Sequence, residues 1–146
     1  MMMARALELA RRAASIGEVP VGAVVYRSDG SVLAEAYNRR EVDGDPSAHA
    51  EFIAMRAAAL AIGDWRLSDC SLAVTLEPCP MCAGLVVNAR VARVVYGAPD
   101  PKAGAVDTLF RLLDDARLNH RAQVISGVMA EDAAALLRAF FKTLRR

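Results

Sequence analysis

Pro78-Cys79-Pro80-Met81-Cys82, taken together with His49-Ala50-Glu51 upstream, is the stretch that decides how this chain is organised. A Cys-x-x-Cys pair at the start of a helix presents two thiolates at a separation that a tetrahedral zinc ion can span. The imidazole of His49 supplies a third ligand. Three protein ligands leave one position for water, as in catalytic zinc sites, and the Glu51 carboxylate can then move protons without binding the metal. The sequence therefore predicts a zinc hydrolase.

Hydrophobic periodicity predicts helices and strands around this stretch. Helices are expected over residues 3–15, 50–62, 79–88, 109–118 and 131–144, and strands over residues 21–27, 31–37, 71–76, 91–96 and 124–126. The first helix should end at Gly17, and Ser47 is a candidate cap for the second. Segments 38–46 and 97–105 are rich in turn residues and are expected to be loops. The strand–helix–strand order over residues 71–96 indicates a parallel crossover, so the chain is predicted to be α/β.

Length and composition restrict the class of protein. With 146 residues, 55% of them hydrophobic, the chain is expected to form one domain spanning residues 1–146. The net charge of +1 gives no overall basic field, so a nucleic acid would have to be bound by local patches. Three cysteines in a chain of this length do not form a disulfide framework. Neither a signal peptide nor an apolar run of about 18 residues is evident, so we expect a cytoplasmic protein without a membrane span.

The spacing of His49 and Glu51 predicts that they lie at a junction between a loop and a helix. Residues two apart inside a helix point in nearly opposite directions, so both reach one site only where a loop enters a helix. Cys79 likewise begins a helix directly after a strand. The two helix N-termini would then face one metal, and their positive dipole ends favour the thiolate form of cysteine.

Other readings of these residues stay open. Cys70 could be a fourth ligand of a structural zinc, but an extended strand would place it about 20–30 Å from Cys79, so we expect it to be buried and inert. Glu51 could instead be an exposed carboxylate favoured by the helix dipole. His120 could be a structural hydrogen-bonding residue or a site residue. Glu77 is a competing base, yet beside Pro78 it is expected to support the metal loop.

A resemblance to a known family extends these motifs. His-Ala-Glu followed by Pro-Cys-x-x-Cys is the signature of zinc-dependent nucleobase deaminases. The resemblance is to the bacterial tRNA-specific adenosine deaminases and covers nearly the whole chain. It is carried by Val19–Ala23, Asp45–Glu51, Val74–Gly84, Arg93–Ala98, Asp100–Ala105, Leu118–Arg121 and the Phe140-Phe141 pair.

This resemblance implies a fold and an activity. The fold would be cytidine-deaminase-like, with three α/β/α layers and a five-stranded mixed sheet. The protein would be a homodimer with one Zn²⁺ per chain, converting adenosine to inosine at the wobble position of a tRNA anticodon, usually in an arginine tRNA. Zinc-bound hydroxide would attack the base, and Glu51 would shuttle the protons.

Substrate contacts are also implied by the resemblance. They would come from Asn38, the backbone N–H of Ala50, Asp100, Lys102, Asn119 and His120. Asn38 and Asp100 could equally be plain turn residues. Val106-Asp107-Thr108 departs from the Gly-Ser that many relatives have at this point. The basic helix end, formed by Arg138, Lys142, Arg145 and Arg146, is either solvated or neutralises tRNA phosphates.

Two other functions remain. The first is a deaminase of free bases or nucleosides, such as guanine or cytosine, which uses the same metal chemistry. The second belongs to a different class: a non-catalytic, zinc-stabilised RNA-binding module. The loop at 98–105 and Asn119-His120 favour tRNA as the substrate.

Overall fold

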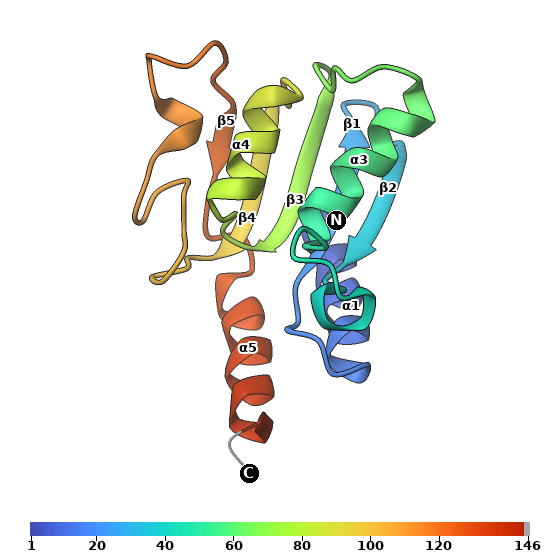
Figure 1. The fold of residues 1–146 in the computed structure, drawn as a ribbon, viewed down its shortest axis with the longest axis vertical. Coiled ribbons are helices and arrows are strands. Elements are labelled where there is room, and N and C mark those ends of the chain that lie inside the picture. Colours follow the sequence, from blue (N-terminus) through green and yellow to red (C-terminus); the bar gives the residue numbers. More distant parts are fainter. Residues whose placement is uncertain (145–146) are drawn as a thin grey trace.

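Five strands form a mixed sheet in the order β2-β1-β3-β4-β5, in a computed structural model that describes residues 1–144 (Figure 1). The strands are β1 (Gly22–Arg27), β2 (Val32–Tyr37), β3 (Cys70–Leu76), β4 (Arg93–Ala98) and β5 (Gln123–Ile125). The helices are α1 (Met2–Ser15), α2 (Arg40–Asp43), α3 (Ala50–Ile62), α4 (Pro80–Asn88), α5 (Ala130–Leu144) and a 3₁₀ turn, η1 (Leu112–Asp114). Most elements begin and end within two residues of their predicted bounds.

Strand directions place the ends of β3 and β4 together. β1 runs antiparallel to both β2 and β3, whereas β3, β4 and β5 are mutually parallel. The helix between β3 and β4 is therefore a parallel crossover, as predicted. Leu76 pairs with Ala98, so the carboxyl ends of both strands lie at one edge of the sheet. This edge is where ligands commonly bind in α/β proteins.

Each face of the sheet has its own apolar core. On one face α3 and α4 pack their small residues, such as Ala54 and Ala83, against Val25 and Val74. On the other face α1 and α5 contribute Leu7 and Ala133 against alternate strand positions. Successive side chains of each strand point to opposite faces of the sheet, so each strand contributes to both cores. The sheet with helices on both faces forms three α/β/α layers.

Three local predictions were wrong. Residues 109–118 form only η1, because the Asp115 carboxylate accepts the backbone N–H of Arg117 at 2.9 Å and thus favours a turn. Ser47 does not cap α3, since its N–H and hydroxyl both donate to Asp45. The predicted loop at 38–46 contains the short helix α2.

Two further expectations concern the ends and the membrane. Arg145 and Arg146, part of the expected basic end, lie outside the described residues. Within residues 1–144, every helix is too short or too polar to cross a membrane.

Candidate active site

Two helix N-termini meet at the carboxyl edge of the sheet. His49 is the N-cap residue of α3, and Cys79 is the N-cap residue of α4, just beyond the end of β3. Both have extended backbones, with ψ of 148° and 174°. The N-cap position turns each side chain out of its helix, which is the loop-to-helix placement that the spacing predicted.

The side chains of His49, Cys79 and Cys82 converge. The Nδ1 atom of His49 lies 3.6 Å from Sγ of Cys79 and 3.7 Å from Sγ of Cys82. All three potential ligand atoms are within 4.8 Å of one another. Zinc–ligand bonds of about 2.0–2.3 Å at tetrahedral angles separate ligand atoms by about 3.5 Å. The cluster therefore fits a zinc ion.

The pKa values of the two thiols in the cluster shift in opposite directions. A hydrogen bond from Cys82, with help from His49, lowers the pKa of Cys79 to about 4. The same hydrogen bond, together with burial, raises the pKa of Cys82. Because metal ligands must be deprotonated, a metal that binds here would displace the proton of the Cys82 thiol.

Cys70 is not part of this cluster. It is fully buried at the start of β3, and burial raises the pKa of its thiol to about 11. The thiol therefore stays protonated and packs as a small apolar group, as expected.

Glu51 is the second residue of α3 and is only 4% exposed. Burial raises the pKa of its carboxyl to about 7. A carboxyl group that gains and loses a proton near neutral pH suits general acid–base chemistry. Glu51 lines the same pocket as two of the three candidate ligands. The alternative of an exposed helix-start carboxylate is excluded by this burial.

The pocket beside the cluster has a volume of about 210 Å³. It is lined by Val19, Val21, Asn38, Arg40, His49, Ala50, Glu51, Leu76, Glu77, Cys79, Asp100 and Ala103. Pockets for drug-sized ligands are larger, roughly 300–1,000 Å³, so this one admits only a small group. The mostly apolar walls of this pocket, with a few polar atoms, suit one planar ring that carries polar groups at its edges.

Three of the expected substrate contacts reach this pocket: Asn38, Ala50 and Asp100. Asn38 is buried, and its amide donates to the carbonyl of Val19 at 3.3 Å. The Asp100 carboxylate accepts the N–H groups of Lys102 and Ala103, which is turn chemistry at the pocket wall. Lys102 is exposed beside the pocket without lining it.

Asn119 and His120 are not brought to the pocket. The Nε2 atom of His120 lies 2.7 Å from the carbonyl oxygen of Val91, which precedes β4. That is the amino end of β4, whereas the pocket lies beyond the carboxyl ends of β3 and β4. This contact agrees with a structural hydrogen-bonding role for His120. A contact of either residue with substrate stays a prediction.

Glu77 organises the loop on the far side of the pocket. Its carboxylate is 2% exposed and accepts the backbone N–H groups of Asp100, Val106, Asp107 and Thr108 at 2.8–3.1 Å. Burial raises the pKa of Glu77, but these hydrogen bonds outweigh it, and the pKa lies below its ordinary value. Glu77 therefore supports the 100–108 loop, whereas we expected it to support the metal loop.

The fit around Glu77 also requires a glycine. A Cβ atom at Gly104 would lie 2.5 Å from the Glu77 carboxylate, closer than any real Cβ contact. Sequence reasoning missed this pair, and it also missed Arg40 at the pocket rim and the buried Glu18. The contacts of Glu77 and Glu18 join segments far apart in the chain, and Arg40 stands in a helix too short to show a periodic pattern, so no local spacing marks these residues.

Comparison with known proteins agrees with this geometry. The MafB19-like deaminase family matches residues 1–145. The chain is 49% identical to the tRNA-specific adenosine deaminase of Bacillus subtilis (strain 168) over 144 residues, which is 99% of this chain and 89% of that protein.

Solved structures match as well. One from studies of A-to-I editing by tRNA:A34 deaminases matches with a TM-score of 0.89 and 43% identity, over 93% of this chain and 98% of that one. The guanine deaminase from Nitrosomonas europaea matches at 0.84 with 26% identity, over 95% and 82%. The first of these confirms the deaminase fold with its five-stranded mixed sheet. With the family match covering all but the last residue, the chain belongs to the MafB19-like deaminases.

Proposed function

We propose that this protein is a zinc-dependent tRNA adenosine deaminase that converts the wobble adenosine of an anticodon to inosine. The observation that carries the proposal is the buried Glu51 carboxylate beside His49, Cys79 and Cys82 at a pocket that admits one small ring. The choice of tRNA is supported by the 49% identity to a tRNA-specific relative over nearly the full chain.

The reaction is a hydrolysis: adenosine and water give inosine and ammonia. His49, Cys79 and Cys82 would hold one zinc ion per chain. Zinc in such a site lowers the pKa of water and so supplies a nucleophile at neutral pH. Glu51 would take one proton of that water as its oxygen adds to C6 of the adenine ring, and would deliver this proton to N1. The carboxylate would then take the remaining proton of the added hydroxyl and give it to the C6 amino group, so that the C6–N bond breaks and ammonia leaves. Its pKa of about 7 suits both transfers.

The pocket walls would hold the base during these steps. Asn38 offers an amide, and Ala50 offers the backbone N–H at the first position of α3. Asp100 and Lys102 would meet the anticodon backbone from the loop that Glu77 supports. Anticodon loop nucleotides are already largely unpaired, so turning one into the pocket costs less than opening a duplex.

A second candidate is deamination of a free base, which is favoured by the structural match to a guanine deaminase. That match has 26% identity, against 49% for the tRNA-specific relative, so tRNA is the preferred substrate. The test is ammonia release by the zinc-loaded protein from an arginine-tRNA anticodon stem-loop, adenosine, guanine and cytosine. Turnover of the stem-loop alone supports the proposal, and turnover of guanine or cytosine alone overturns it.

The protein is also proposed to be a cytoplasmic homodimer. Large apolar side chains are exposed on the face formed by α3 and α4: Leu60 is 81% exposed and Trp65 is 53% exposed. A groove lies there between the two helices, with Met55, Ala59, Leu85 and Ala89 among its lining residues. Exposed apolar patches of this kind are typical of protein–protein contacts.

A further inference from the structure

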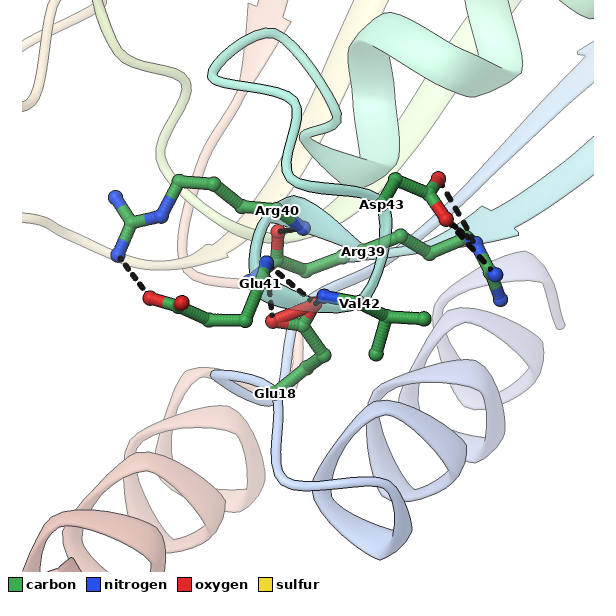
Figure 2. Close-up of polar contacts among 7 residues, drawn as sticks. Glu18, Arg39, Arg40, Glu41, Val42 and Asp43 are labelled. Atoms are coloured by element: carbon green, nitrogen blue, oxygen red, sulfur yellow. Dashed lines mark hydrogen bonds and ion pairs between the residues drawn. The ribbon is translucent and has the colours of Figure 1, made fainter.

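Glu18 is a buried carboxylate with an unusual set of partners. It follows α1 and is 1% exposed. Its Oε1 and Oε2 atoms accept the N–H of Glu41 at 2.9 and 3.0 Å, and Oε2 also accepts the N–H of Val42 at 3.3 Å. Figure 2 shows these bonds entering the start of α2 from below. A buried carboxyl group whose oxygens accept backbone N–H groups indicates a specific positional task.

That task is to cap α2. A helix leaves its first N–H groups without partners, and a side chain at the N-cap position usually accepts one of them. Here the N-cap residue is Arg39, whose side chain has no acceptor. Asn38 accepts the N–H of Arg40 at 3.2 Å, and Glu18 accepts the next two N–H groups. A helix of four residues is not stable alone, so its placement depends on these bonds.

Glu18 is itself held from the other side. Gly17 adopts φ of +82°, a left-handed conformation that ends α1. The N–H groups of Gly17 and Glu18 donate to Ala14 and Ala13 at 3.1 and 2.9 Å, which is the Schellman arrangement. The end of α1 thus fixes the backbone of Glu18, and the carboxylate transmits that position to α2.

The two arginines at the start of α2 point in opposite directions (Figure 2). Arg39 pairs with Asp43 at 3.0 Å and lies over the ring of Tyr37. Arg40 lines the pocket, and within residues 1–144 its guanidinium forms an ion pair only with the exposed Glu41 side chain, at 4.0 Å. Exposed pairs at such a distance contribute little, so the charge of Arg40 is available to a ligand at the rim.

We infer that Glu18 is a positioning residue, which fixes α2 so that Arg40 binds a backbone phosphate beside the adenosine in the pocket. A planar guanidinium suits phosphate oxygens. The inference rests on the proposed function, because a polynucleotide supplies that phosphate and a free base or nucleoside does not. Arg40 therefore helps this pocket to distinguish RNA from free adenosine.

Arg40→Ala tests the phosphate contact. For an anticodon stem-loop we expect KM to rise about tenfold, with kcat changed less than about twofold. Binding of a fluorescent stem-loop should lose about 0.7 from the slope of log K against log salt, the share of one phosphate on a single strand. Arg11→Ala is the matched control, since it removes one exposed arginine from α1 and should leave KM and the salt slope unchanged.

Glu18→Gln tests the positioning. Glutamine keeps the size of the side chain but turns an N–H₂ group toward N–H donors, so the cap is partly lost. We expect KM for the stem-loop to rise about fivefold with zinc content unchanged. Arg40→Ala should then have a smaller effect in the Glu18→Gln background than alone, because both changes remove one contact.

The outcomes separate the two proposals. If the wild type deaminates the stem-loop and Arg40→Ala keeps its full salt slope, this inference is overturned and the proposed function stands. Fully additive effects of the two substitutions overturn the role of Glu18. A wild type that deaminates guanine and does not bind the stem-loop overturns both. Arg40 is on the surface, so Arg40→Ala still tests the phosphate contact if Glu18→Gln does not fold.

Discussion

Glu51 is the residue on which the proposed chemistry depends most. It is buried at the pocket, and it does not belong to the His49–Cys79–Cys82 cluster. Glu51→Gln keeps the shape of the side chain and removes its proton transfer, so we expect kcat on an anticodon stem-loop to fall at least about 100-fold. Zinc per chain should stay at the wild-type level. Steady-state kinetics and atomic emission measure the two quantities.

Glu8→Gln is the control for that substitution, because Glu8 is an exposed carboxylate on α1. It should leave kcat and zinc unchanged. If Glu51→Gln retained wild-type turnover, the proton shuttle would have to be another group, and Glu77 and Asp100 are the other acidic residues of the pocket lining.

The thiols provide a prediction about metal retention. Cys82→Ala removes one of three candidate ligand atoms that lie within 4.8 Å of one another. We expect the variant to lose most of its zinc on dialysis and to lose turnover with it. Cys70→Ala is the matched control, since it deletes an equally buried thiol outside the cluster and should keep one zinc per chain. Zinc retained by Cys82→Ala, or lost by Cys70→Ala, would show that the ligand set is wrong.

The positions of some site residues could be predicted from the sequence, whereas the position of Glu18 could not. His49, Cys79 and Cys82 were brought together as predicted, because zinc ligands must sit at short, recognisable spacings on helix starts. Glu18 has no such signature. Its partners are backbone N–H groups at Glu41 and Val42, which every residue except proline offers, so nothing in the sequence marks the pair.

Among the elements, the loop after β4 is held by the side chain of Glu77. Glu77 accepts four backbone N–H groups and the hydroxyl of Thr108 from this loop. Glu77→Gln leaves some of these buried donors without an acceptor, each costing roughly 1–3 kcal/mol. We expect the free energy of unfolding to fall by about 3 kcal/mol in urea denaturation. Hydrogen exchange should accelerate at Val106 and Asp107 before it does in β3.

The same carboxylate should make stability depend on pH. The folded pKa of Glu77 lies below its ordinary value of 4.5, so its ionised form stabilises the fold above that pH. The contribution is lost as the pH falls from about 4.5 through the folded pKa. The difference in unfolding free energy between wild type and Glu77→Gln should therefore be largest near neutral pH and narrow below pH 4.5. A constant difference down to pH 3 would exclude the ionised carboxylate as its source.

Elements with a strong periodic pattern were predicted within two residues, and the failures have local causes. Residues 109–118 have helix-compatible leucines, but the side-chain turn at Asp115 competes with helical hydrogen bonds. The short helix α2 was missed because its caps are Glu18, far away in sequence, and Asn38. A helix of that length has no periodicity to detect.

For the whole molecule, the parallel crossover at β3 and β4 followed from the order of elements, whereas the strand order did not. β1 lies between β2 and β3, a placement set by packing of α1 and α3 on opposite faces. Only the resemblance to a family indicated a five-stranded mixed sheet. Local patterns determine which residues form a strand, and the tertiary core determines which strands become neighbours.

The homodimer is the prediction that belongs to this scale. Stable dimers bury about 800 Å² on each partner around a few large apolar side chains. On the α3–α4 face those side chains are Leu60 and Trp65, beside the groove between the helices. We expect the double substitution Leu60→Glu and Trp65→Glu to convert a dimer into a monomer at micromolar concentration. Light scattering coupled to size exclusion measures the mass.

The control is Ile16→Glu, which adds one acidic residue at the exposed end of α1, on the opposite side of the sheet. It should leave the mass unchanged, since the proposed contact does not include α1. Because two acidic side chains at an apolar contact would be buried without partners, the double variant should dissociate even if it folds normally. If instead the double variant stays dimeric and Ile16→Glu dissociates the protein, the contact lies on the α1–α5 face.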